Sequence, residues 1–151
     1  FGVTPGQSSF RFILDSGAAY HVAPPSFGVH FPLEPMQQHI KLRSASGQVL
    51  DILGVRKVAY RIAGLPLQIT STFIICDVKH VLMSIPQLTE HRNQVLFNNG
   101  PTGCVLQTPK GSVDVPRYGR LHALEVTLVG GPNTYDLIAE GDEDMGDMSP
   151  M

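Results

Sequence analysis

Glycine and proline divide this chain into short segments, which limits the folds it can adopt. There are 15 Gly and 12 Pro among 151 residues. Between them lie short stretches rich in apolar residues, several alternating apolar with polar residues as half-buried β-strands do. We expect strands at residues 8–14, 39–43, 48–53, 55–62, 67–75, 78–83, 94–97, 103–108, 112–115 and 121–128. The pattern predicts an all-β fold in one domain.

A single helix is expected, over residues 85–92. Ser84 followed by Gln87 is a capping-box pattern, and Pro86 suits a first helical turn. The folded domain should occupy residues 1–128. Residues 129–151 are Gly-rich and then acidic, without apolar periodicity, so we expect a disordered tail there.

Charge and cysteine content exclude several classes of protein. The net charge is −2 and no basic stripe is present, which argues against direct nucleic-acid binding. Cys76 and Cys104 lack metal-ligand spacing, so we expect reduced, core or half-buried thiols in a non-secreted, cytoplasmic protein. The histidines also lack metal-like spacing, and neither a metal nor another cofactor is expected.

Two further expectations concern the chain as a whole. No apolar run approaches the ~20 residues of a membrane span, so no membrane association is expected. Because the sequence begins with Phe1 rather than Met, we expect it to be part of a longer product.

The segment with the clearest chemical meaning is Asp15-Ser16-Gly17-Ala18, which follows an apolar stretch. An aspartic protease needs two carboxylates about one hydrogen bond apart, which share a proton because both cannot ionise. A strand must deliver the Asp, a hydroxyl can brace the loop, and a Gly lets two backbones approach. The alternative is a surface turn in which Asp or Ser caps local amides.

Only one Asp-Ser/Thr-Gly occurs in the chain. The other aspartates, among them Asp51, Asp77, Asp114 and Asp136, lack the following Ser/Thr-Gly. One chain would therefore carry half of a catalytic pair. The aspartic protease hypothesis requires a homodimer in which two-fold symmetry supplies the second Asp15.

Residues 13–22 (ILDSGAAYHV) closely resemble the start of the protease of copia-like LTR retrotransposons, where an apolar pair precedes Asp-Ser-Gly-Ala and a His follows. Four later stretches appear in the order of that family: residues 44–55, 78–88, 95–100 and 119–122. The resemblance spans about residues 10–125. It implies a retropepsin-like closed barrel with a flap hairpin and one short helix, forming half of a two-fold symmetric aspartic protease.

The resemblance also implies an activity and its participants. The enzyme would be a homodimer without cofactor, cleaving the element's own Gag-Pol polyprotein, in a virus-like particle if the element is active. The peptide would bind as an extended strand. Residues from about 94 to 128 would lead toward the pre-integrase region.

The implied site residues extend beyond Asp15. Ser16, Gly17 and Ala18 would support the catalytic loop. The turn of Ser44, Ala45, Ser46 and Gly47 would be the flap, whose amides bind the substrate backbone. Its alternative is a plain hairpin turn.

His21 is expected to pack or hydrogen bond near the catalytic loop, because an aspartic protease needs no histidine base. The rival hypothesis for the whole chain is an inactive or domesticated module of the same fold, serving dimerisation or peptide binding. A nucleic-acid-binding module is disfavoured by the near-neutral charge.

Overall fold

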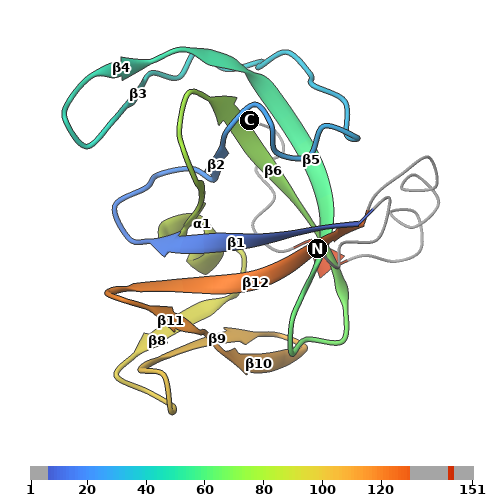
Figure 1. Ribbon diagram of the computed structural model, residues 1–151, viewed down its shortest axis with the longest axis vertical. Coiled ribbons are helices and arrows are strands. Elements are labelled where there is room, and N and C mark those ends of the chain that lie inside the picture. The colour runs from blue at the N-terminus through green and yellow to red at the C-terminus, as the bar shows by residue number, and fades with distance from the viewer. Residues whose placement is uncertain (1–6, 130–142, 145–151) are drawn as a thin grey trace.

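A computed structural model describes residues 7–129 and 143–144 of the chain (Figure 1). Its main sheet closes on itself, because the strand order β1-β7-β2-β6-β5-β12 returns to β1 through a second pairing. These strands are β1 (Gln7–Asp15), β2 (Val22–Ala23), β5 (Ile52–Ile62), β6 (Gln68–Cys76), β7 (Val81–Ser84) and β12 (Leu121–Val129). The pairs β1–β7 and β2–β6 are parallel, whereas the other four are antiparallel.

Smaller elements extend this closed sheet. A three-stranded sheet lies at one end, and a two-stranded hairpin projects at the other (Figure 1). They consist of β8 (Gln94–Phe97), β9 (Cys104–Thr108) and β10 (Gly111–Asp114), and of β3 (Leu42–Arg43) with β4 (Val49–Leu50). β11 (Arg117–Tyr118) pairs with β12, and β13 (Glu143–Asp144) pairs with β6. α1 (Ile85–Glu90) follows β7 directly and is the one helix among the described residues.

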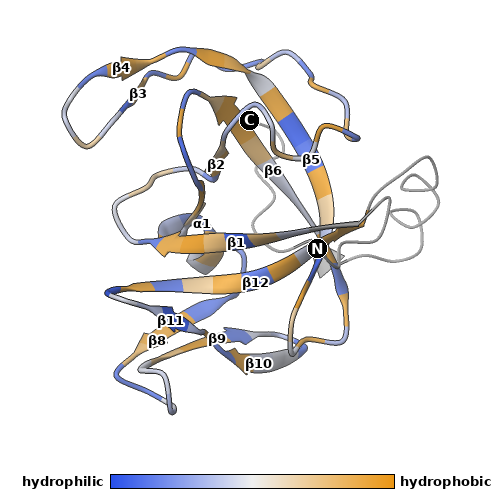
Figure 2. Cartoon of the chain, in the orientation of Figure 1, coloured by the Kyte–Doolittle hydropathy of each residue, from blue (hydrophilic) through white to orange (hydrophobic). Residues whose placement is uncertain are grey.

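Aromatic rings fill the interior of the closed sheet. Phe12 of β1 makes edge-on contacts with Phe27, Tyr60 and Phe73, with centroids 5.0–5.5 Å apart. All four side chains are buried. Figure 2 shows hydrophilic residues interspersed among hydrophobic ones along β5 and β12. Both strands contain runs of consecutive buried residues, such as 58–60 of β5, so parts of them are covered on both faces. Phe27 comes from the loop after β2, so that loop covers the core from outside the sheet.

The prediction of an all-β fold with one short helix is confirmed for the described residues. The helix ends at Glu90 rather than 92, because Arg92 adopts a φ of 69° that an α-helix cannot continue. The predicted strand at 78–83 begins only at Val81. The turn from β6 occupies the preceding residues, where the Val78 N–H donates to the Cys76 carbonyl.

Two predictions around the projecting hairpin were wrong in their boundaries. Of residues 39–43, only Leu42–Arg43 pair as a strand. The expected break at Gly54 does not occur, because β5 runs through it with a bulge between Ile52 and Gly54.

Of the predicted tail at 129–151, Val129 belongs to β12 and Glu143–Asp144 to β13. Its other residues lie outside the described part, so the disordered tail stays a prediction.

Candidate functional site

Asp15 is the last residue of a strand that is held on both sides. β1 pairs antiparallel with β12 as far as Ile13, and parallel with β7 from Phe12 to Asp15. Phe12 and Leu14 point into the core, and Asp15 itself is half-buried at the strand end. The alternation that buries these two side chains therefore delivers the carboxylate to the edge of the core.

The loop after Asp15 faces solvent. The Gly17 N–H donates to Asp15 Oδ1 at 2.8 Å, and Ser16 and Gly17 are exposed. A Cβ added to Gly17 would meet Asp15 Oδ1 at 3.4 Å, an ordinary contact. The contacts of the described residues therefore do not require glycine at this position.

The far side of the loop is attached to the start of α1. The Ser84 hydroxyl donates to the Ala18 carbonyl at 2.6 Å, and the Ser84 N–H donates to His21 Nδ1 at 2.9 Å. The His21 N–H donates to Gln87 Oε1 at 3.0 Å. Ser84, Gln87 and His21 are all buried. The prediction that His21 forms hydrogen bonds near the loop is confirmed.

The capping box expected from Ser84 and Gln87 forms only in part. The Gln87 N–H donates to Ser84 Oγ at 3.1 Å, so Ser84 is the N-cap as predicted. In a full capping box the Gln87 side chain would bind the Ser84 backbone. Here it binds His21 instead, and the Ser84 N–H binds the His21 ring. Sequence reasoning found both residues but missed their bonds to the loop.

The predicted flap is a well-formed hairpin turn. The Gly47 N–H donates to the Ser44 carbonyl at 2.9 Å, and the hydroxyls of Ser44 and Ser46 lie 2.8 Å apart. Gly47 has a φ of +89° with open space around it, and Ala45, Ser46 and Gly47 are exposed. Figure 1 shows the hairpin projecting on the same side of the molecule as the end of β1.

A second apolar cluster links the base of this hairpin to the Asp15 loop. Its buried members are Val22, Val55, Ile74 and Cys76. Half-buried side chains from three regions pack against it, including Tyr20 of the loop, Leu42, Leu50 and Ile52 beside the flap, and Leu82 of β7. Residues that flank the two predicted site segments, Tyr20 after the first and Leu42 and Leu50 around the second, therefore share one apolar cluster. The hydrogen bonds described for the flap turn stay within the hairpin.

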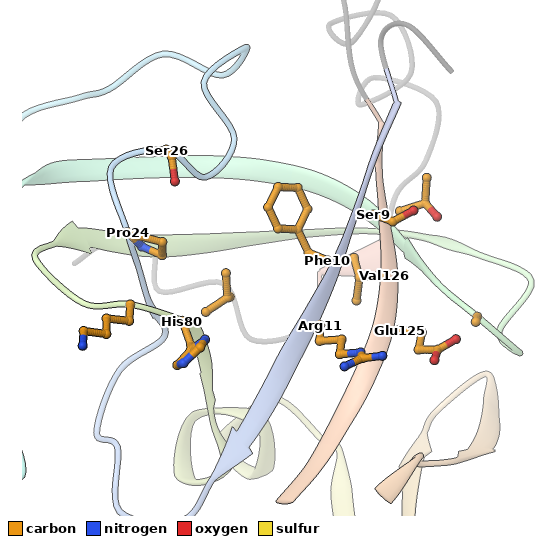
Figure 3. A pocket seen from close by; sticks show the side chains of 12 residues that line it. Ser9, Phe10, Arg11, Pro24, Ser26, His80, Glu125 and Val126 are labelled. Atoms are coloured by element: carbon orange, nitrogen blue, oxygen red, sulfur yellow. The ribbon is translucent and has the colours of Figure 1, made fainter. Parts of the chain in front are cut away.

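Two hollows differ in their relation to Asp15. One, of about 430 Å³, lies beside the loop and is lined by Ser16 to Tyr20 and by Pro86, Gln87 and Glu90 of α1. The larger hollow, of about 680 Å³, lies along the first half of β1, away from the Asp15 loop. Figure 3 shows Phe10 between Pro24 and Ser26 on one side and β12 on the other. Asp15 is not among the residues that line either hollow. The smaller one adjoins the candidate site through residues 16–20, which follow Asp15, whereas the larger one contains no residue of this loop.

Arg11 and Glu125, which line the larger hollow, both interact with the Tyr118 side chain. The Arg11 guanidinium lies 3.8 Å from the centre of the Tyr118 ring, and the Tyr118 hydroxyl donates to Glu125. That bond raises the pKa of Tyr118, and the adjacent Glu125 charge adds to the effect, opposed by Arg11. The described groups here form a surface network rather than an acid–base pair.

Both cysteines are free and buried, as predicted. Burial, helped by the Asp77 charge, raises the pKa of Cys76 to about 11, and burial also raises the pKa of Cys104. Both thiols are therefore protonated at neutral pH and poor nucleophiles. Among the described residues, no three His, Cys, Asp or Glu side chains gather as metal ligands, and no helix is long and apolar enough to span a membrane.

No protein-family model, curated protein or solved structure matches the chain.

Proposed function

We propose that the chain is one half of a retropepsin-like aspartic endopeptidase of the copia-like retrotransposon kind, acting as a homodimer on a Gag-Pol polyprotein. The observation that carries this proposal is the position of the Asp15 carboxylate at the end of β1. A half-buried carboxylate stands at the end of a doubly paired strand, in a loop braced from behind and open in front. The closed sheet and the projecting hairpin agree with the fold that the resemblance implies.

In the proposed dimer, the two Asp15 carboxylates share one proton across the two-fold axis. The ionised partner takes a proton from a water, which attacks the peptide carbonyl carbon. The protonated partner donates to the carbonyl oxygen as the tetrahedral intermediate forms. The intermediate collapses when the carboxyl that now holds the proton donates it to the amide nitrogen and the other carboxylate takes a proton from a hydroxyl of the intermediate. The C–N bond breaks, the acid and amine products leave, and the pair again holds one shared proton.

The second apolar cluster supplies a surface for an extended peptide. Its half-buried members come from both sides of the space that the peptide would occupy, namely Tyr20 from the loop and Leu50 and Ile52 from beside the flap. Alternate side chains of an extended strand would enter apolar subsites there, and flap amides would bind its backbone. The proposed enzyme therefore prefers apolar residues next to the scissile bond.

The test compares wild type with Asp15→Asn on polyprotein-derived peptides at mildly acidic pH, with a pepstatin-type inhibitor. Removing the ionisable group should lower kcat/KM by about 10²–10⁴-fold, the range typical of general acid–base groups. Asp114→Asn, which changes an exposed carboxylate on the separate β10 strand, is the matched control and should cleave like wild type.

Equal cleavage by Asp15→Asn and wild type would eliminate the mechanism. If neither cleaves at concentrations where sedimentation shows a dimer, the rival hypothesis of an inactive dimerisation or peptide-binding module replaces it.

A further inference from the structure

The Asp15 loop takes its shape from residues far away in the sequence. Within the loop, the Gly17 N–H donates to Asp15 Oδ1. The Ile74 N–H of β6 donates to the His21 carbonyl at 2.9 Å. The remaining anchors described for the loop lie 63 to 66 positions further along the chain, at Ser84 and Gln87. They bind Ala18 and His21, which follow the residues that would face the partner and the substrate.

The anchors form one connected unit. Ser84 ends β7, which pairs with β1 in the register Asp15↔Ser84, and it also caps α1. Its hydroxyl accepts from the Gln87 N–H and donates to the Ala18 carbonyl, so both hydroxyl functions are used. A shift of the start of α1 would therefore move the loop and the end of β1 together.

We propose that Ser84 and Gln87 are positioning residues for the Asp15 carboxylate, acting through the backbone of the 16–21 loop. The inference rests on the proposed protease function for its consequence, but the positioning itself is a property of one protomer. Two carboxylates that must meet across a symmetry axis tolerate little displacement, since an error in either loop changes their separation. Misplacement of about 1 Å costs roughly 10²-fold in rate.

The chemistry of Gln87 makes the proposal specific. Its Oε1 is an acceptor for a buried backbone N–H, and only 5% of the residue is exposed. Methionine has a similar length but offers only a weak acceptor, so Gln87→Met would leave the His21 N–H poorly satisfied. Gln87→Glu keeps an acceptor oxygen at the same reach.

The experiment measures kcat, KM and amide hydrogen exchange in the full chain. Gln87→Met should lower kcat by about 10²-fold with little change in KM, and residues 16–21 should exchange faster while β5 and β6 do not. Gln87→Glu should recover most of the lost kcat. Ser84→Ala and Ser84→Thr form a second pair, in which threonine keeps the hydroxyl and should retain activity.

Thr89→Val is the matched control. Thr89 lies in the same helix, is exposed, and its hydroxyl donates to the Pro86 carbonyl at 2.8 Å without touching the loop. It should leave kcat and loop exchange unchanged. Wild-type kcat in Gln87→Met, or an equal loss in Thr89→Val, would overturn the proposal.

Hydrogen exchange separates this inference from the proposed function. If wild type cleaves nothing while Gln87→Met still accelerates exchange at 16–21, the protease function fails and the positioning survives. If exchange at 16–21 is the same in both proteins, the positioning is disproved whatever the activity.

Discussion

Single residues in this protein take their roles from their surroundings. Asp15 belongs to a triplet that also occurs in ordinary turns, and it differs from Asp51 and Asp77 because a doubly paired strand ends at it. His21, which could have been a base, is buried with Nδ1 accepting from the Ser84 backbone, so its proton lies on Nε2. Cys76 is likewise a core residue rather than a nucleophile.

Burial of Cys76 predicts a specific dependence of stability on pH. Its pKa is about 11 in the folded chain against 9.0 for an unperturbed thiol, so between these values the folded state holds a proton that the unfolded state has lost. Stability from this group is complete below pH 9 and is lost as the pH rises toward 11, by up to about 3 kcal/mol.

Urea unfolding of wild type and Cys76→Ala at several pH values between 8 and 11 tests this expectation. The variant should be less stable throughout because of its smaller side chain, but should lose less stability across that range. Parallel curves for the two proteins would contradict the proposed titration of Cys76.

At the scale of elements, the projecting hairpin and β5 each contain a glycine, at positions 47 and 54, but for different structural reasons. Gly54 lies at the bulge of β5 with a φ of +153°, and a Cβ there would meet the Glu34 carbonyl oxygen at 2.5 Å. Glu34 and Val55 exchange two backbone hydrogen bonds of 2.8 Å at this point. Gly47 at the flap tip has a positive φ but no neighbour within 4 Å. One position is therefore restricted by packing and conformation, the other by conformation alone.

Matched alanine substitutions should separate these two costs. Gly54→Ala should destabilise the chain by more than about 2 kcal/mol, because the new methyl group displaces the backbone at Glu34, which pairs with Val55 in an isolated bridge. Gly47→Ala should cost about 1–2 kcal/mol from left-handed strain only. Urea unfolding measures both, and equal losses would contradict the close approach at Gly54.

At the scale of the whole molecule, the closed sheet positions one Asp15 carboxylate, and in the proposed dimer a second copy would supply the other. The pairing of β1 with both β7 and β12 holds the end of β1 in place, while Ser16 and Gly17 remain exposed beside it. Among the described residues, a Cβ at Gly17 would meet only Asp15 Oδ1, at 3.4 Å, which agrees with the proposed role at a close approach between two chains. The proposed dimer therefore makes a prediction about mixtures.

Adding Asp15→Asn protein to wild type should inhibit cleavage, because mixed dimers lack one carboxylate. With random exchange of protomers, an equal amount of variant should reduce the activity of a fixed amount of wild type to about half, and a threefold excess to about a quarter. Asp114→Asn should not inhibit. Undiminished activity in well-exchanged mixtures would show that one protomer carries a complete site.

Much of the fold could be predicted because its signals are local. Gly and Pro turns, the short apolar stretches of β5 and β12, and the Ser84 cap each depend on neighbouring residues, and all of them appear in the structure. Predicted strand boundaries were wrong where pairing with a strand distant in the sequence determines where a strand begins or ends. β5 continues through Gly54 because β6 pairs on both sides of the bulge, and nothing in the local pattern indicates that pairing.

The candidate site divides in the same way. The hairpin turn at 44–47 and the end of an apolar strand at Asp15 could each be predicted, because each feature is contiguous in the chain, and both appear in the structure. The catalytic and flap roles of these residues stay predictions. The attachment of Ala18 and His21 to Ser84 and Gln87 arises only when β7 lies beside β1 and carries the start of α1 to the loop. A side chain such as Gln87 has several possible partners of similar energy, and the surrounding packed fold selects among them.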